Sequence, residues 1–380
     1  MTARNCIERV VYRIIDGELR RIKKWRVTTD DSIEVEGETS RNLGMDHDDW
    51  ARAGLPTIRT VAEAIAVVRA SCAAMGITLQ EWELERIALW ALDLSHAYRM
   101  LSVQRFEWGQ QLYIWEDGVR LDLRCLFGSA HLVDFFERVT LFVLKVSQFR
   151  TAEYHAQHER TASRNRWAAW REEHVGAGAG SCEESFIYLD DACGISILGP
   201  GEDVTGGRPD VPVRASLHVE PGGGVKLGTF ARASTPQIDL AIARATFQEA
   251  GWDIAIDKVQ LGPAIEQLGF EIDARGQGAL RVPEAKRLGI GEDIIAQQQL
   301  GDEQKVARHT DVERLVGRCV NLATVMVEAN PHMASMYRMK EAKVVVKANG
   351  KRLRVTPKFI TVAGAGQHGQ NYQDALAWWR

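Results

Sequence analysis

Residues 186–198 read FIYLDDACGISIL, two short apolar runs on either side of the adjacent acids Asp190 and Asp191. Such runs around two polar residues predict a β-hairpin that carries both carboxylates at its tip. Two like charges side by side raise each other's pKa unless a counter-charge is near, and a pair of divalent cations is one such counter-charge. The structural alternative is that an isolated Asp-Asp pair is only a turn.

A third acid ends another apolar stretch. Residues 87–92, IALWAL, are typical of a buried strand, and Asp93 comes directly after them. If this strand neighbours the hairpin, Asp93, Asp190 and Asp191 converge on one point. Such a cluster can hold two metal ions about 3.5–4 Å apart, one activating an attacking hydroxyl and the other stabilising a leaving phosphate. Oxygen-only ligands favour Mg²⁺.

The composition is that of a folded globular protein. The chain has 380 residues, 45% of them hydrophobic and 26% charged, which suits two or three packed units. Its 47 basic and 51 acidic residues give a net charge of −4, which excludes a polybasic protein but not a local basic groove.

Several other classes are disfavoured. The 6 cysteines contain no Cys-x-x-Cys pair, which argues against a disulfide scaffold and a zinc ribbon. The N-terminus is charged where a signal peptide needs an apolar core, and no apolar run approaches the ~20 residues that cross a bilayer. His155 and His158 stand three apart near an acid, but no further ligands accompany them at metal spacing. We therefore expect a soluble intracellular protein of the cytoplasm or nucleus.

Periodicity predicts several helices. Apolar residues recur three and four apart over residues 130–149, which predicts a helix with one apolar face. Another helix is expected over 235–251, where Thr-Pro opens the segment and Gly closes it. Helical sequence continues over 283–328, with a break near 289–301, a segment that contains three glycines.

Turn residues predict further hairpins and two insertions. Asp117-Gly118 and Asn349-Gly350 each separate two strand-like runs. Residues 150–181 are polar and Arg-rich, and residues 199–234 are rich in Gly and Pro. Both stretches are expected to be surface insertions, either solvated or in contact with nucleic acid through the arginines of the first.

Tyr188-Leu189-Asp190-Asp191 resembles the Tyr-x-Asp-Asp signature of reverse transcriptases, and four further stretches resemble the family's other motifs in the family's order. They are Lys24-Trp25-Arg26 with Asp30, Asp93 followed five residues later by Tyr98, Phe127-Gly128 with Phe136, and the segment 251–270 with Lys258 and Leu268-Gly269. The matching stretches extend over residues 20–290. The closing Leu376-Ala377-Trp378-Trp379 is similar to the segment that lies after the polymerase in tyrosine-recombinase-type (DIRS-like) retrotransposons.

This resemblance implies an α+β right-hand polymerase fold, with an antiparallel palm sheet packed on helices. Fingers and palm would occupy residues 1–275, including the insertions at 150–181 and 199–234. Residues 276–380 would form a thumb or connection that ends before the place where a ribonuclease H domain would start. The implied activity is RNA-directed DNA synthesis, in which a primer 3′-hydroxyl attacks a deoxynucleoside triphosphate on an RNA or DNA template. Two Mg²⁺ ions would be the cofactors, with Mn²⁺ as a substitute, and no membrane partner is expected.

The resemblance also implies roles at the metal site. Asp93 and Asp190 would be the principal metal ligands. Asp191 would complete the acidic cluster, and the carbonyl of Leu94 could add a ligand. Lys258 could protonate the pyrophosphate leaving group, or it could simply pair with an acid.

Other motif residues would bind the substrates. Lys24 and Arg26 would neutralise the triphosphate, with a solvated basic loop as the alternative. Tyr98 would sit under the sugar and exclude a 2′-hydroxyl, with an ordinary core tyrosine as the alternative. Phe127-Gly128 would bear on the template and nucleotide, because glycine lets the backbone approach closely. Leu268-Gly269 would grip the primer, with a plain strand turn as the alternative.

One departure keeps two other functions open. The family's loop usually reads Leu-Pro-Phe-Gly with a later Ala-Pro, whereas this chain has Cys125-Leu126-Phe127-Gly128 and then Val133. An altered loop is compatible with a catalytically inactive nucleic-acid-binding relic of a mobile element. An RNA-dependent RNA polymerase is the third possibility, although Tyr98 argues against it.

Overall fold

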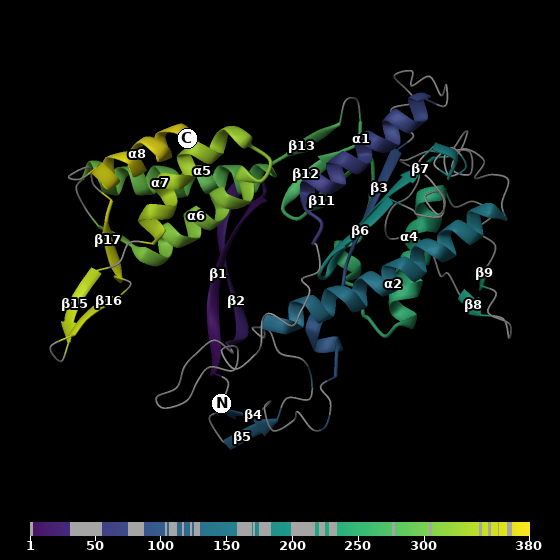
Figure 1. Cartoon of the computed structure of the whole chain (residues 1–380), viewed down its shortest axis with the longest axis horizontal. Coiled ribbons are helices and arrows are strands. Elements are labelled where there is room, and N and C mark those ends of the chain that lie inside the picture. Colours follow the sequence, from purple (N-terminus) through teal and green to yellow (C-terminus); the bar gives the residue numbers. More distant parts are fainter. Residues whose placement is uncertain are drawn as a thin grey trace. The chain divides into compact units, whose positions relative to one another are not determined.

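The computed structural model describes residues 3–30, 55–74, 87–102, 105, 112–115, 118–121, 124, 130–157, 169, 172–174, 184–198, 217–219, 225–227, 234–275, 278–303, 306–341, 344–348, 351–355, 357–362 and 367–380. The chain forms two compact units (Figure 1). Unit 1 contains residues 1–8 and 25–281, and unit 2 contains residues 9–24 and 282–380. The expected boundary after residue 275 and the assignment of 276–380 as a thumb or connection stay predictions.

A four-stranded antiparallel sheet is the centre of unit 1. Its strands are β3 (Ile87–Asp93), β6 (Glu184–Tyr188), β7 (Asp191–Ile197) and β10 (Gln260–Gly262). They lie in the order β10-β3-β7-β6, and every neighbouring pair is antiparallel. Every residue of β3 except Asp93 is buried, which explains its uninterrupted apolar sequence.

Two long helices cover this sheet. The helix α2 (Ala130–Ala156) packs against β6, and α4 (Thr235–Glu249) packs against β3 and β7 (Figure 1). Their side chains join those of the strands in one apolar core around Trp90, Phe136 and Phe247. The expected mixed α and β fold with an antiparallel sheet packed on helices is therefore confirmed.

Gly194 leaves room in this sheet for the large side chain of Trp90. Gly194 of β7 pairs with Trp90 of β3. A Cβ atom on Gly194 would lie 2.3 Å from the Trp90 ring, so only glycine leaves room for the fully buried indole. The glycine after Asp190-Asp191 is therefore a packing residue of the core.

The structure corrects the prediction of one apolar face on the helix over 130–149. Phe136 and Val143 are buried against the core, but Phe135, Phe142 and Phe149 are exposed on another side. The three- and four-residue spacing fits a helix, but this helix carries apolar side chains on two sides, which the spacing does not separate.

Residues 150–156, which were assigned to the first predicted insertion, belong to α2. Two of their side chains, Arg150 and His155, have partners on α4. Arg150 contacts Glu249 at 2.7 Å, and the buried His155 Nε2 lies 2.5 Å from Asp239 Oδ1. Ser196 donates a 2.5 Å hydrogen bond to the other oxygen of Asp239, so a buried polar network joins α2, α4 and β7. His158 lies outside the described residues.

Smaller elements complete unit 1. They are α1 (Ile58–Ala74), η2 (Ala97–Met100), β4 (Leu112–Trp115), β5 (Gly118–Leu121), β8 (Leu217–Val219), β9 (Val225–Leu227), η5 (Ile256–Lys258), β11 (Ala264–Gln267), β12 (Phe270–Asp273) and β13 (Ala279–Arg281). The strands β4 and β5 form an antiparallel pair, which confirms the hairpin predicted at Asp117-Gly118. The strands β11, β12 and β13 form an antiparallel three-stranded sheet. The strands β8 and β9 pair within the stretch 199–234, so this insertion is not wholly a loop as expected.

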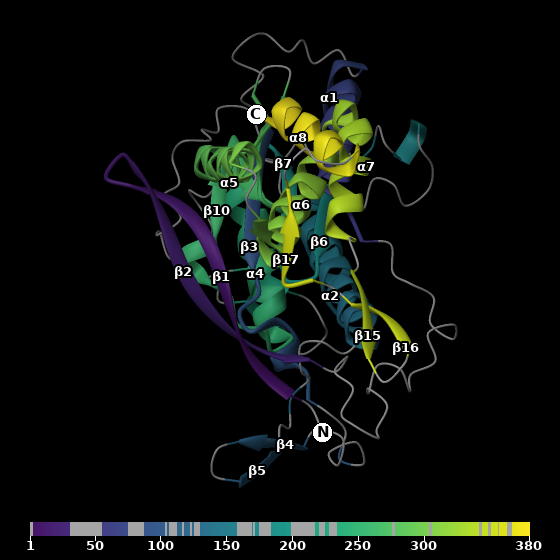
Figure 2. The same cartoon turned by 90° about the vertical axis from the view of Figure 1, so that its left-hand side faces the viewer.

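Unit 2 is mainly helical. Its helices are α5 (Glu284–Asp302), α6 (His309–Ala323), η6 (Val327–Ala329), α7 (Asn330–Lys340) and α8 (Gln367–Trp379). The strands β14 (Val306–Arg308) and β17 (Phe359–Thr361) pair with each other, as do β15 (Val344–Ala348) and β16 (Lys351–Val355). The second pair confirms the hairpin predicted at Asn349-Gly350. Figure 2 shows α7 and α8 side by side, in agreement with their contacts.

The predicted break near 289–301 is wrong, because α5 is continuous from residue 284 to 302. Its Gly289 has a packing role: a Cβ atom there would lie 2.3 Å from the ring of Tyr12. Tyr12 belongs to the hairpin of β1 (Ala3–Ile15) and β2 (Glu18–Asp30), and its hydroxyl donates a 3.0 Å hydrogen bond to Asp293 on the same helix. Arg318 pairs with Asp293 as well, and its guanidinium lies 5.2 Å from the centre of the Tyr12 ring.

None of the helices in the described part of the chain is both long and apolar enough to cross a bilayer.

Candidate active site

The three acids predicted from the sequence lie together at one end of the two inner strands of the central sheet. Asp93 ends β3 and Asp191 begins β7, and the two are direct partners in the ladder. Asp190 lies in the turn between β6 and β7, and its carbonyl accepts a 2.8 Å hydrogen bond from the backbone N–H of Leu94. Sequence segments about a hundred residues apart are thus joined at this end by backbone pairing.

The turn differs by one residue from the expected one. It consists of Leu189 and Asp190, and Asp191 is already paired with Tyr188 as the first residue of β7. One carboxylate therefore lies on the turn and the other on the strand, facing Asp93 across the ladder.

The site carries an excess of negative charge. Burial, reinforced by the neighbouring Asp190 and Asp93, raises the pKa of Asp191 to about 7, and only Lys258 acts in the opposite direction. Asp191 can therefore keep its proton near neutral pH until another cation arrives. Such a perturbed carboxyl group at the end of a strand is typical of a functional site.

Lys258 supplies the positive charge next to these acids. Its ammonium lies 2.7 Å from Asp93 Oδ2, and its side chain is 58% exposed while that of Asp93 is 16% exposed. The backbone brings the two together, because the carbonyl of Asp93 accepts a 2.9 Å hydrogen bond from Ala255, three residues before the lysine. Pairing with an acid, one of the two roles considered for Lys258, is therefore observed, and proton transfer to a leaving group stays a prediction.

Glu137 of α2 forms a hydrogen bond with the backbone of the turn. Its side chain is buried, and its Oε2 accepts a 2.9 Å hydrogen bond from the backbone N–H of Leu189. Burial raises the pKa of Glu137, and the hydrogen bond from Leu189 lowers it. Leu189 has φ +57°, a left-handed conformation that a leucine rarely adopts. Glu137 was not among the residues predicted from the sequence, although an acid on the core side of a predicted helix was a usable signal.

Gln267 contacts the site from the other side. Its side-chain amide donates a 3.2 Å hydrogen bond to the carbonyl of Asp191. Leu268 and Gly269 come next as a two-residue turn between β11 and β12, with φ +51° and +76°. The predicted primer-grip residues thus form a tight turn one residue from a contact with the acidic cluster, which is compatible with both alternatives given for them.

The donor chemistry fits a hard divalent cation, because the side chains are carboxylates and the site lacks charge balance. As they stand, however, no three Asp, Glu, His or Cys side chains in the described ranges are grouped so that they could hold one ion. Lys258 is the counter-charge of Asp93 in this arrangement. Binding of a cation would therefore require the carboxylates to turn toward it and Asp191 to lose its proton.

Several predicted site residues have no described side chain. Lys24 and Arg26 lie on β2, and Tyr98 lies in η2, but only their backbone is described. Phe127, Gly128 and the altered residue Cys125 lie outside the described residues. Their roles stay predictions.

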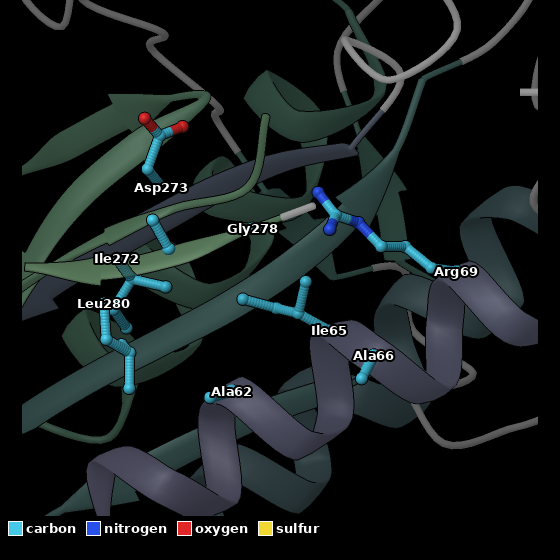
Figure 3. Close-up of a pocket in the computed structure, with 9 residues that line it drawn as sticks. Ala62, Ile65, Ala66, Arg69, Ile272, Asp273, Gly278 and Leu280 are labelled. Atoms are coloured by element: carbon cyan, nitrogen blue, oxygen red, sulfur yellow. The ribbon is translucent and has the colours of Figure 1, made fainter. Parts of the chain in front are cut away.

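A cavity of about 350 Å³ lies elsewhere in unit 1, between α1 and the β12–β13 pair (Figure 3). Its wall is mostly apolar, and Arg69 and Asp273 are its charged residues. Arg69 donates a hydrogen bond to the carbonyl of Ala274, and burial lowers its pKa. None of the predicted site residues lines this cavity.

Neither the known protein-family models nor the curated proteins include a match to this chain. Solved structures do match. Against the foamy viral protease-reverse transcriptase in complex with an RNA/DNA hybrid, the identity is 10% and the TM-score 0.42, over 93% of this chain and 32% of that one. Against the foamy viral protease-reverse transcriptase in complex with dsDNA, the values are 11% and 0.39, over 99% and 52%. The chain thus spans between about a third and a half of these two proteins.

Proposed function

We propose that the chain is the polymerase core of a reverse transcriptase, which extends a primer 3′-hydroxyl with deoxynucleotides. One observation carries the proposal. Asp93, Asp190 and Asp191 lie together where two neighbouring strands of an antiparallel sheet meet the turn, with Lys258 beside Asp93. The Tyr-x-Asp-Asp sequence on the hairpin and the ordered motifs around it support the same activity. The arrangement of fingers, palm and thumb and the DIRS-like origin belong to this proposal.

In the proposed reaction Asp93, Asp190 and Asp191 would hold two divalent cations, and the Leu94 carbonyl would be a further ligand. The cations, when bound, supply the charge that activates the primer hydroxyl and stabilises the pyrophosphate. The chain's own contribution is positioning, since most of the catalysis of phosphoryl transfer is orientation and charge neutralisation. Lys258, freed from Asp93, would hold a proton within reach of the leaving group.

The substrates are a primed RNA or DNA template and deoxynucleoside triphosphates. Lys24 and Arg26 would bind the triphosphate, Tyr98 would select the deoxyribose, and Phe127 with Gly128 would contact the template and the nucleotide. These assignments come from the motifs in the sequence.

Primer extension on poly(rA)/oligo(dT) with Mg²⁺ tests the activity. The unchanged protein should extend the primer, and Asp190→Asn should lower the rate by at least a hundredfold. Asp257→Asn is a matched control, because Asp257 is an exposed acid on η5 next to Lys258. It should retain the rate of the unchanged protein.

Two outcomes would overturn this function. Equal, background-level extension by the unchanged protein and Asp190→Asn, together with retained binding of the primed template, would leave only the nucleic-acid-binding relic that the altered loop at Cys125 suggests. Faster incorporation of ribonucleotides than of deoxynucleotides would instead indicate an RNA-dependent RNA polymerase.

A further inference from the structure

The hairpin β15–β16 of unit 2 lies in a strongly basic stretch of the sequence. Between Glu341 and Asp374 the chain contains no acid and six basic residues. They are Lys343, Lys347, Lys351, Arg352, Arg354 and Lys358. The chain as a whole carries a net charge of −4. A local excess of positive charge in a chain of the opposite net charge is typical of a surface that binds a polyanion.

The strand register assigns these residues to the two faces of the hairpin. Lys347 is the direct partner of Arg352, and Val345 is the direct partner of Arg354. Direct partners in an antiparallel ladder share a face, and so do residues two apart along one strand. Lys347, Arg352 and Arg354 therefore lie on one face, which we name the basic face. Lys351 belongs to the opposite face. The other residues of that face are apolar, namely Val344, Val346, Ala348, Leu353 and Val355.

The three cations of the basic face are close enough to repel one another. Direct partners such as Lys347 and Arg352 have Cβ atoms about 4.5–5.5 Å apart, and diagonal neighbours such as Lys347 and Arg354 lie about 7–8 Å apart. These separations do not exceed the Debye length of about 8 Å at physiological salt, so screening leaves much of the repulsion. Like charges directly opposite each other destabilise a hairpin, and charges of mixed sign would serve solubility as well. The arrangement therefore favours a bound partner with several negative charges.

The position of the hairpin leaves room for a large partner. Figures 1 and 2 show it extending away from the helices of unit 2. Within the described part of unit 2, β15 and β16 pack extensively only on each other. Residues 344–355 include no aromatic residue, so the hairpin offers no platform on which unpaired bases could stack. Its composition favours contacts with a phosphate backbone over contacts with single-stranded bases.

We propose that the basic face of β15–β16 binds the phosphate backbone of a nucleic-acid duplex, whatever its base sequence. The choice of this polyanion rests on the proposed function, in which a primed template is the substrate. Arg352 and Arg354 can each bind a phosphate through two parallel N–H···O bonds, and Lys347 adds a point charge. Contacts of this kind position a duplex without reading its bases. The basic face thus adds a contact with the template–primer that is remote in sequence from Asp93, Asp190 and Asp191.

The salt dependence of duplex binding tests the proposal. Fluorescence anisotropy of a short labelled DNA duplex, without Mg²⁺ or nucleotides, gives the affinity between about 50 and 200 mM salt. Each phosphate contact contributes about 0.9 to the slope of log affinity against log salt, so replacing Lys347, Arg352 and Arg354 together by Gln should reduce the slope by about 2.7. The loss of affinity over this salt range should then be about 40-fold smaller than in the unchanged protein. Arg352→Gln alone should reduce the slope by about 0.9.

Lys351→Gln is the matched control, because it removes one charge from the same hairpin on the opposite face. It should leave the slope unchanged. Urea unfolding should show the triple variant to be at least as stable as the unchanged protein, because the substitutions remove repulsion. An unchanged slope in the triple variant, or an equal change in Arg352→Gln and Lys351→Gln, would overturn the proposal. So would a triple variant that loses binding to phosphatidylserine vesicles but retains binding to the duplex, which would identify a lipid surface as the partner.

Photo-cross-linking tests the face itself. Val345→Cys lies on the basic face and Val346→Cys on the opposite one, since neighbouring residues of a strand alternate between faces. With a thiol-attached aryl azide, Val345→Cys should cross-link to the duplex well above the background of the unchanged protein, and Val346→Cys should not. Equal cross-linking of the two variants would contradict the assignment of the face. Asp190→Asn should retain the salt slope, so a chain that fails to extend primers still tests this proposal separately from the polymerase activity.

Discussion

The carboxylate of Glu137 accepts a 2.9 Å hydrogen bond from the backbone N–H of Leu189, which has φ +57°. A buried acid on α2 thus supports the residue that directly precedes Asp190. Left-handed backbone costs a non-glycine residue of the order of 1–2 kcal/mol, and a hydrogen bond to a charged or strongly polar group is of similar size. Glu137 therefore contributes to the conformation of the turn that presents the acids.

This contact predicts different effects for two substitutions of Glu137. Glu137→Gln retains an oxygen acceptor for Leu189 and should change the rate of nucleotide incorporation by less than about threefold. Glu137→Leu removes the acceptor, and a loss of about 1.4 kcal/mol or more in positioning should lower the rate at least tenfold. Single-nucleotide incorporation measures the rates of the two variants, and urea unfolding checks that both variants are folded.

The control for these substitutions is Glu153→Leu, since Glu153 is exposed on the same helix. It should affect neither measurement. If Glu137→Leu incorporates nucleotides as fast as Glu137→Gln, the hydrogen bond to Leu189 has no part in positioning the turn.

A second prediction concerns Gly194. Gly194→Ala puts a methyl group 2.3 Å from the buried Trp90 ring, so the strand or the indole must move. Overpacking of this kind should destabilise the protein by about 1–3 kcal/mol. In Gly317→Ala the new methyl group meets open space on the exposed side of α6, and helix propensity should stabilise that variant by about 0.5–1 kcal/mol. Opposite shifts of the thermal midpoint are the expected result, and a stabilised Gly194→Ala would contradict the packing of Trp90 on β7.

These two sites illustrate what the sequence could and could not predict. The hairpin at Asp190-Asp191 and the strand that ends at Asp93 were predicted correctly, because local apolar runs and polar breaks determine them. The position of the turn was one residue off, because the hydrogen bond from Leu189 to Glu137 joins residues 52 apart and no local pattern encodes it. The contact of Gln267 with Asp191 was missed for the same reason.

The helices show the same limit. The spacing of apolar residues predicted α2 but could not tell that Phe142 is exposed and Val143 buried, since both sides of the helix are apolar. Glycine predicted a break in α5, whereas Gly289 receives the ring of Tyr12 from a hairpin at the other end of the sequence. From the sequence alone, a glycine needed for packing against a distant residue cannot be distinguished from a glycine that breaks a helix.

A third prediction comes from the charges at the β12–β13 hairpin. Asp273 accepts hydrogen bonds from the backbone and guanidinium of Arg275 and from Arg281 at 2.8–3.0 Å. The bonds from Arg275, assisted by Arg281, hold the pKa of Asp273 well below its ordinary value of 3.8. The folded state favours the carboxylate, so these hydrogen bonds stabilise the fold. Their contribution is fully present above pH 3.8, the pKa in the unfolded chain, and is lost as the pH falls toward the lower pKa of the folded state. Asp273→Asn should cost roughly 1–2 kcal/mol at pH 7 and progressively less below about pH 4.

Urea unfolding at about pH 7 and about pH 3 measures this difference. The control is Glu266→Gln, a change of an exposed acid on the neighbouring strand β11, which should have little effect at either pH. A cost of Asp273→Asn that is equal at the two pH values would show that the pairing with Arg275 and Arg281 does not hold the carboxylate in its charged form.

The last prediction separates the two alternatives for Leu268-Gly269. Both residues have positive φ, and a two-residue hairpin turn of this kind favours Asn-Gly over Leu-Gly. Leu268→Asn should therefore stabilise the protein by about 0.5–1 kcal/mol. If the turn also grips the primer, the same substitution removes an apolar contact, and KM for primed template should rise several-fold while kcat changes little. A stabilised variant with an unchanged KM identifies a plain strand turn. A destabilised variant would instead mean that the leucine side chain contributes more to packing than its backbone conformation costs.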